Sequence, residues 1–259
     1  MLLNKRIRVL LAGVFSQILC LGVARFSYTP LLPLMQQQTW LGEAAGGWLA
    51  AINYFGYICG ALLAASLTSL EVKDRLYRGG LLLAIVSTAG MALTEDLMLW
   101  MLLRFLAGLS SAASMLIASG LILNWLIRNN YRSELGIHFA GVGAGIVVAA
   151  LAVELMLGLT FNWKEQWLWF AAFGGLILLP AWGWMPRPEP VAASAPQMAD
   201  MPPTKRFMWL MLAAYFCAGY GYVVTATFIV AFVEQQPSLQ GMGAWVFVFV
   251  GLGAAPAVM

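Results

Sequence analysis

Long apolar runs follow one another along this chain, separated by short polar gaps. Charge almost vanishes for roughly 20 residues at a time, the length that a helix needs to cross about 30 Å of hydrocarbon. The pattern predicts eight membrane-spanning helices, at residues 9–35, 44–69, 79–94, 97–127, 135–159, 165–185, 207–233 and 241–259. The expected fold class is therefore an all-α polytopic membrane protein.

The composition agrees with a membrane protein, because 62% of residues are hydrophobic and only 10% are charged. Soluble domains carry about 25% charged residues, so a soluble protein is excluded. Cys20, Cys59 and Cys217 each lie inside a predicted span, far from a second ligand. They are interpreted as small hydrophobic residues, and neither a disulfide nor a metal site is expected.

Lys and Arg concentrate in every second gap between the apolar runs, and this distribution predicts the orientation of the chain in the membrane. Eleven of the fourteen lie in one set of gaps: Lys5, Arg6, Arg8, Lys73, Arg75, Arg78, Arg128, Arg132, Arg187, Lys205 and Arg206. Only Lys164 lies in the other set. Positive residues stay on the cytoplasmic side, so the amino terminus is predicted to be cytoplasmic. The net charge of +3 then reflects topology, and no nucleic-acid partner is expected.

A Pro-rich segment at 186–206 divides the chain and is predicted to be a cytoplasmic linker. Before it, residues 1–185 form an expected six-helix bundle, and residues 207–259 follow it as two further helices. A shift of 197 residues superimposes the start of the chain on this second part, pairing Cys20 with Cys217, Gly22 with Gly219, Gln38 with Gln235, Gly46 with Gly243, Trp48 with Trp245 and Gly56 with Gly253. The register predicts a parallel duplication of six-helix units.

Two stretches resemble a known family. The first run contains GVARFSYTPLLPLM at residues 22–35, and the fourth contains RFLAG at residues 104–108. On these residues the chain resembles the major facilitator superfamily (MFS), and within it the YbfB/YjiJ-like group of bacterial inner-membrane proteins. The resemblance implies two six-helix bundles and a secondary transporter that works by alternating access. It also implies location in the bacterial inner membrane.

Two motifs of the superfamily are poorly kept. The loop after the second helix usually reads Gly-x-x-x-Asp-Arg-x-Gly-Arg-Arg, whereas here Gly60 is followed at a longer spacing by KDR at 73–75 and then Arg78. The fifth run lacks the Gly-Pro pair that marks antiporters, so solute exchange against protons is not supported. Twelve helices are expected of the family, and the chain contains the first two helices of the second bundle. It is therefore expected not to transport alone.

Three charged residues lie within the spans, where each costs several kcal/mol unless it is paired or faces water. Arg25 and Glu154 lie about 24 and 28 Å from the cytoplasmic ends of their helices, and Arg104 lies about 10 Å from the outer end of its helix. One hypothesis places all three in one layer, with Arg104 and Glu154 as an ion pair and Arg25 as a residual charge for an anionic substrate. The alternative is a structural Arg104–Glu154 clamp, with Arg25 extending to the outer headgroups. Glu154 is also the candidate proton site.

Polar aromatic residues add to this candidate site. Tyr28 lies on the first helix near Arg25, and the second helix places Asn53, Tyr54 and Tyr57 close together. Tyr222 is the repeat equivalent of Arg25. These side chains are predicted to bind substrate in a central cavity, although Tyr is also enriched at membrane interfaces. His138, near the cytoplasmic end of the fifth helix, is expected to form interfacial hydrogen bonds.

These features predict a secondary active transporter of a small organic solute, with an organic anion as the suggested substrate. Its expected partners are that solute, with a coupled proton left open, and the lipid bilayer. A single His and scattered Cys argue against an enzyme, and no cofactor is expected. No nucleotide-binding loop occurs, so ATP is not expected to drive transport. The alternatives are a non-transporting membrane partner or receptor, or an inactive half-carrier fragment.

Overall fold

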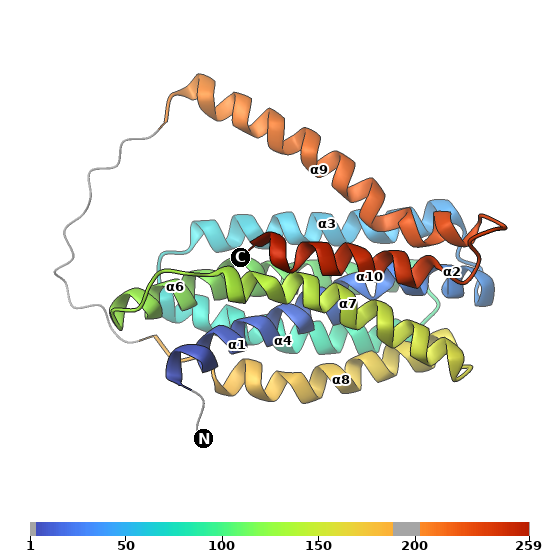
Figure 1. Cartoon of the computed structure of the whole chain (residues 1–259), viewed down its shortest axis with the longest axis horizontal. Helices are drawn as coiled ribbons and strands as arrows, with labels where there is room; N and C mark the ends of the chain where they lie inside the picture. Colours follow the sequence, from blue (N-terminus) through green and yellow to red (C-terminus); the bar gives the residue numbers. More distant parts are fainter. Residues whose placement is uncertain (1–3, 189–202, 259) are drawn as a thin grey trace.

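The structure is a computed structural model, and it describes residues 4–188 and 203–258. All regular structure within these residues is helical. In chain order the elements are α1 (Lys5–Gln17), η1 (Ile18–Phe26), α2 (Tyr28–Gln38), α3 (Glu43–Ser66), α4 (Leu70–Ala92), α5 (Leu97–Ala112), η2 (Ala113–Ile117), α6 (Ala118–Arg128), α7 (Gly136–Gly158), α8 (Trp163–Gly183), α9 (Lys205–Glu234), α10 (Gly243–Ala254) and η3 (Pro256–Val258). The long helices run side by side in an elongated bundle (Figure 1).

Six stretches are long and apolar enough to cross a membrane, by length and composition. They are Lys5–Gln38, Glu43–Ser66, Leu97–Arg128, Gly136–Gly158, Trp163–Gly183 and Lys205–Glu234. The first and third are composite, because π-helical η1 and η2 join their α-helical parts. α10 is a shorter apolar helix, and α4 is not among the six. The all-α polytopic fold is confirmed.

The start of α4 differs from its sequence prediction. The apolar pattern placed the helix at 79, with Lys73, Arg75 and Arg78 in the preceding loop, whereas α4 begins at Leu70. The Ser69 hydroxyl caps this end by accepting a hydrogen bond from the Val72 backbone nitrogen at 3.4 Å. The charged residues therefore lie on the helix itself.

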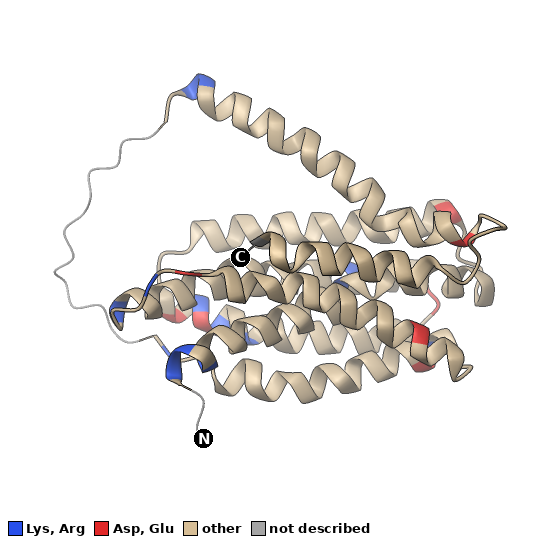
Figure 2. Cartoon of the chain, in the orientation of Figure 1, with Lys and Arg blue, Asp and Glu red and all other residues tan. Residues whose placement is uncertain are grey.

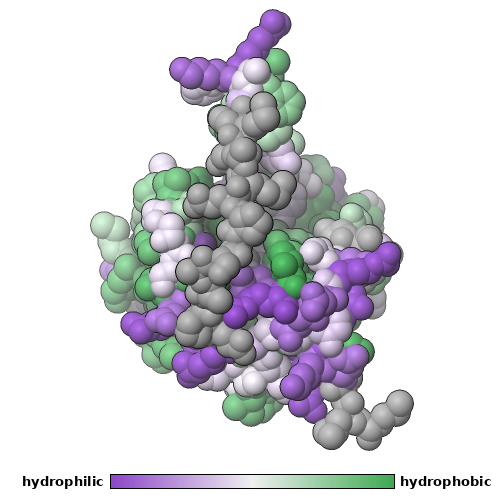
Figure 3. Space-filling view, turned by 90° about the vertical axis from the view of Figure 1, so that its left-hand side faces the viewer, coloured by the Kyte–Doolittle hydropathy of each residue, from purple (hydrophilic) through white to green (hydrophobic). Residues whose placement is uncertain are grey.

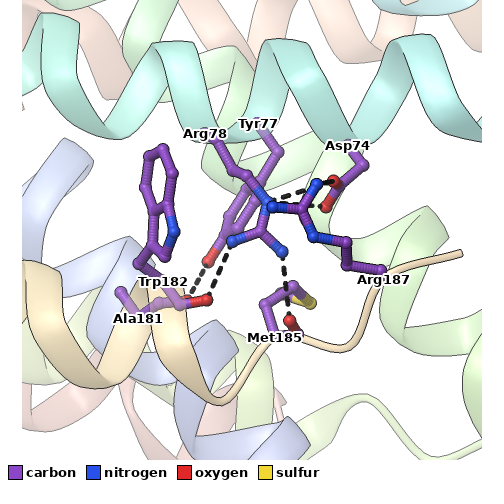
Figure 4. A network of polar contacts seen from close by, with 7 residues as sticks. All are labelled: Asp74, Tyr77, Arg78, Ala181, Trp182, Met185 and Arg187. Carbon is purple, nitrogen blue, oxygen red and sulfur yellow. Dashed lines mark hydrogen bonds and ion pairs between the residues drawn. The ribbon is translucent and has the colours of Figure 1, made fainter.

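Arg78 can be buried on α4 because it is fully partnered (Figure 4). Its Nε donates to both Asp74 carboxylate oxygens, at 3.1 and 3.0 Å. Its terminal nitrogens donate to the carbonyls of Trp182 and Met185 at 3.0 and 3.2 Å. These carbonyls lie at the end of α8, where the helix has no donors of its own. The contact joins α4 to α8.

Close backbone contacts hold the central helices together. A Cβ atom on Gly22 of η1 would lie 2.7 Å from the Cα of Gly145 on α7. On α5, a Cβ atom on Gly108 would overlap the Asn53 carbonyl oxygen and lie 2.8 Å from the Tyr57 backbone nitrogen, both on α3. Small residues permit such approach between membrane helices. These glycines therefore permit backbone contact between neighbouring helices.

The two helices after the linker attach to the first bundle through a small second core. It joins η1, α7, α9 and α10 and consists of Leu21, Phe26, Ile146, Ala150, Val230, Phe247 and Val248. Thr29 Oγ1 also donates to the Ala226 carbonyl oxygen at 3.0 Å, and these residues are 197 positions apart. The shift of 197 residues pairs Thr29 with Ala226 in the predicted duplication, so this hydrogen bond joins two positions that the prediction treats as equivalent. Most of the predicted linker, 189–202, lies outside the described residues.

We expect Gly108→Ala to destabilise the protein, because the added methyl group would overlap the backbone of α3. Overpacking of this kind lowers the free energy of unfolding by about 1 to 3 kcal/mol. Thermal unfolding in detergent measures the effect. The matched control is Gly120→Ala on α6, where an added Cβ atom meets open space. Equal melting temperatures for the two variants would contradict the proposed packing.

Candidate functional site

Arg25 lies in the π-helical segment η1 and is 9% exposed. Its guanidinium lies over aromatic rings, 4.5 Å from the ring centroid of Tyr54, 5.0 Å from that of Tyr57 and 5.5 Å from that of Phe26. A cation within about 6 Å of a ring centroid is attracted by the ring face. Within residues 4–188 and 203–258, no acid pairs with it and no oxygen accepts its hydrogen bonds. The positive charge of Arg25 thus has aromatic neighbours and no anionic partner in this part of the chain.

Arg104, on α5, is 3% exposed and has a different role. Its guanidinium donates to the Ala24 carbonyl oxygen at 3.0 Å and to the Arg25 carbonyl oxygen at 3.4 Å. It also lies 4.4 Å from the ring centroid of Tyr28. Arg104 therefore fixes the backbone of the first span beside Arg25.

The sequence explains why these carbonyls need a donor. η1 has five-residue hydrogen bonding, as in the bond from the Ser27 backbone nitrogen to the Gly22 carbonyl at 2.9 Å. Four-residue bonding resumes with the bond from the Leu31 backbone nitrogen to the Ser27 carbonyl, so only residues 28–30 remain to donate to the four carbonyls of residues 23–26, and Pro30 has no N–H. Arg104 supplies the missing hydrogen bond. An irregular backbone in hydrocarbon is tolerated only when such a partner is present or water is near.

Tyr28 and Asn53 are held in place by backbone carbonyls. The Tyr28 hydroxyl donates to the Gly46 carbonyl oxygen at 2.8 Å, and Asn53 Nδ2 donates to the Arg104 carbonyl oxygen at 2.8 Å. Both side chains are 1% exposed. They join the first span to α3 and α3 to α5, so the walls of the site are fixed by hydrogen bonds.

A small cavity lies among these residues, with a volume of about 20 Å³. It is lined by Arg25, Phe26, Tyr28, Thr29, Ala50, Asn53, Tyr54, Arg104 and Thr227. Such a volume holds about one water molecule. The structure therefore shows the site closed, between the first bundle and α9.

The cavity brings together five of the seven residues predicted to bind substrate: Arg25, Tyr28, Asn53, Tyr54 and Arg104. Tyr57 contacts Arg25 through its ring but does not line the cavity. Tyr222 interacts electrostatically with Arg25, yet it is 46% exposed and also lies outside the lining. Thr29 and Thr227 were not in the predicted set. Thr29 follows Arg25 by four residues, a spacing that places both on one helix face.

Glu154 does not form the predicted ion pair with Arg104. In the described part of the chain, Arg104 bonds only to carbonyls, and Glu154 lines another pocket of about 350 Å³ with Pro30, Pro33 and Glu234. The contact of Gly22 with Gly145 explains the difference. Arg25 lies three residues beyond Gly22 on η1, and Glu154 lies nine residues beyond Gly145 on α7. At about 1.5 Å per residue, the difference places Glu154 about 9 Å beyond Arg25 along the bundle. The prediction that Arg25, Arg104 and Glu154 lie in one layer was wrong. Proton coupling by Glu154 stays a prediction.

His138 lies in the first turn of α7, and its side chain is buried within the bundle, with 0% exposure. Its Nε2 lies 2.8 Å from Gln17 Nε2 and 3.0 Å from Ser119 Oγ. The hydrogen bonds expected of it therefore join α1, α6 and α7 inside the bundle. Across residues 4–188 and 203–258, no group of three His, Cys, Asp or Glu side chains is arranged to hold a metal ion.

Comparison with known proteins identifies the family. The sequence model of a family described as "Uncharacterised MFS-type transporter YbfB" matches residues 17–259. The chain belongs to this family of MFS-type transporters. It is 26% identical over 258 residues to "Uncharacterized MFS-type transporter YceJ" of Bacillus subtilis (strain 168), a match that covers 92% of this chain. The chain spans 62% of the length of that MFS-type relative.

We expect Arg104→Gln to destabilise this MFS-type protein more than Arg25→Gln does. The first variant leaves buried carbonyls of η1 without donors, at about 1 to 3 kcal/mol for each unsatisfied group. The second removes a guanidinium that donates no hydrogen bond to the described residues. Parallel thermal unfolding of both variants in detergent makes the comparison. A larger loss for Arg25→Gln would contradict these separate roles.

Proposed function

We propose that the protein forms the solute-binding part of a secondary carrier for a small organic anion. Membership of an MFS-type transporter family supports the carrier class. The substrate class rests on one observation, the buried Arg25 guanidinium that has no anionic partner among the described residues. A charge inside a membrane is costly unless it is paired. A carboxylate on the solute would supply the partner.

The aromatic neighbours of Arg25 favour an organic solute over a simple inorganic ion. Tyr54 and Tyr57 present ring faces to the guanidinium, and both come from α3. A solute that enters between them would gain apolar contact as well as charge pairing. Solute pockets of this kind combine apolar walls with a few polar groups that fix orientation.

Alternating access fits the position of the cavity. Its walls come from the first bundle and, through Thr227, from α9. The contacts between these two parts include the Thr29–Ala226 hydrogen bond, the small second core and the close approach of Gly143 on α7 to Gly251 on α10. We propose that rocking of the second helical unit about these contacts opens the site to one side at a time.

We expect Arg25→Gln to weaken solute uptake by about thirtyfold or more, because the solute anion loses its charged partner. Arg25→Lys should retain part of the activity. The measurement is uptake of a panel of radiolabelled carboxylic acids by cells that express the complete reading frame containing this chain.

The matched control for this assay is Arg75→Gln, which removes an exposed positive charge outside the cavity. Its uptake should equal that of the unmodified protein. Expression and melting temperature are checked for each variant. Full uptake by a folded Arg25→Gln variant would refute the anion-binding role.

The distribution of charge supports a cytoplasmic amino terminus. Lys and Arg gather at the end of the bundle where α1 begins and α6 ends (Figure 2). At the opposite end Lys164 pairs with Glu95 at 2.7 Å. Retention of positive residues in the cytoplasm would orient the helices accordingly.

We expect reporter fusions to give opposite signals at the two ends. Green fluorescent protein joined after Arg132 should fluoresce, since it folds in the cytoplasm. Alkaline phosphatase joined after Gln38 should be active, since it requires the other side of the membrane. The reversed pattern would overturn the orientation.

A further inference from the structure

A second pocket lies at the basic end of the bundle and has a volume of about 300 Å³. Its walls come from the first residue of α1, the last turns of α6 and the residues that follow α8. This is far from Arg25 along the first span, about 30 Å at 1.5 Å per residue from Lys5. The proposed transport site does not account for this pocket.

Three positively charged residues line the pocket: Lys5, Arg128 and Arg187. No Asp or Glu is among its described lining residues. The nearest described acid to Arg187 is Asp74, at 3.9 Å, and Arg78 holds that carboxylate more closely, at 3.0 Å (Figure 4). The side chain of Arg187 is 75% exposed, whereas that of Asp74 is 4% exposed. Lys5 and Arg187 therefore bring positive charge from two separate segments, whereas Arg128 already has an interaction of its own.

The remaining lining complements this charge. Asn124, which has a side-chain amide, and the aromatic Trp125 are also among the lining residues. Trp125 is itself held by stacking on Tyr131, with ring centroids 5.7 Å apart. Amide and guanidinium N–H groups are good donors to phosphate oxygens, while an indole face packs on apolar atoms. The site thus offers both a place for an anion and a surface for an attached hydrocarbon.

Its position corresponds to the depth of lipid headgroups. Lys5 begins the first candidate span, Arg128 ends the third, and Arg187 follows the span that ends at Gly183. Figure 3 views the molecule from this end and shows a band of hydrophilic side chains across it. Basic pockets between membrane helices on the cytoplasmic side are sites where anionic headgroups bind.

We propose that this pocket binds a phosphate group, supplied by the headgroup of an anionic phospholipid. Lys5 and Arg187 hold the phosphate oxygens from two sides, and Trp125 contacts the glycerol and upper acyl atoms. Binding would tie the start of α1 to the end of α6 and to the segment after α8. The proposal does not depend on the solute that the protein carries.

The test is native mass spectrometry of the full chain, purified in detergent and mixed with phosphatidylglycerol or phosphatidylcholine. We expect phosphatidylglycerol to be retained preferentially. Lys5→Gln and Arg187→Gln should each weaken its binding about fivefold, the contribution expected of one basic residue near a membrane surface. Arg75→Gln, at the same end of the bundle but outside the pocket, is the matched control and should bind like the unmodified protein.

A second arm adds excess inorganic phosphate without lipid and follows the melting temperature. Stabilisation that is lost in Lys5→Gln, together with displacement of phosphatidylglycerol, would support the phosphate site and assign it to a soluble phosphate. Equal retention of the two lipids by the unmodified protein would overturn the proposal. So would an equal loss of binding in Arg75→Gln, because the attraction would then be diffuse. The lipid comparison on the unmodified protein does not depend on the folding of any variant.

Discussion

The hydrogen bonds from Arg104 to the first span are the interaction on which the centre of this protein depends. Pro30 and the π-helical segment before it leave carbonyls that no backbone N–H can reach, in a part of the chain that lies within the hydrocarbon. Gly108, one turn further along α5 from Arg104, allows that helix to touch α3. A backbone defect in one helix is thus repaired by a side chain from another.

That repair gives the two buried arginines separate roles. Arg104 donates to carbonyls and lies over the ring of Tyr28, so its N–H groups already have partners. Arg25 projects from the same repaired segment but meets ring faces only, among the described residues. Arg25, a buried cation without a hydrogen-bond acceptor among the described residues, lies beside the second cation Arg104. This arrangement is costly for stability, because the two charges also repel. The cost is consistent with a binding role for Arg25.

The sequence predicted the architecture well because hydropathy and loop charge act locally. The helical spans follow from hydropathy along the chain. Arg25, Tyr54 and Arg104, which line one cavity, could each be located by counting residues along its own helix. Errors occurred where partners on other helices decide the outcome. Arg78 lies on α4, where the end of α8 offers it carbonyls. Glu154 was misplaced because depth was counted from the helix ends, whereas the Gly22–Gly145 contact shows that α1 and α7 do not begin at the same level.

The closed cavity constrains how a solute could enter. About 20 Å³ admits no organic molecule, so binding requires separation of α9 from the first bundle. The amino-terminal part of α9 already lies away from the bundle and is exposed from Lys205 to Tyr222, whereas Ala226, Thr227, Val230 and Val233 are buried. Contact is therefore concentrated near the end of α9 that faces away from the linker. Arg25 lies on the linker side of the Thr29–Ala226 hydrogen bond, so for the proposed solute, entry past α9 from that side would break less of the packing of α9 than entry from the other side.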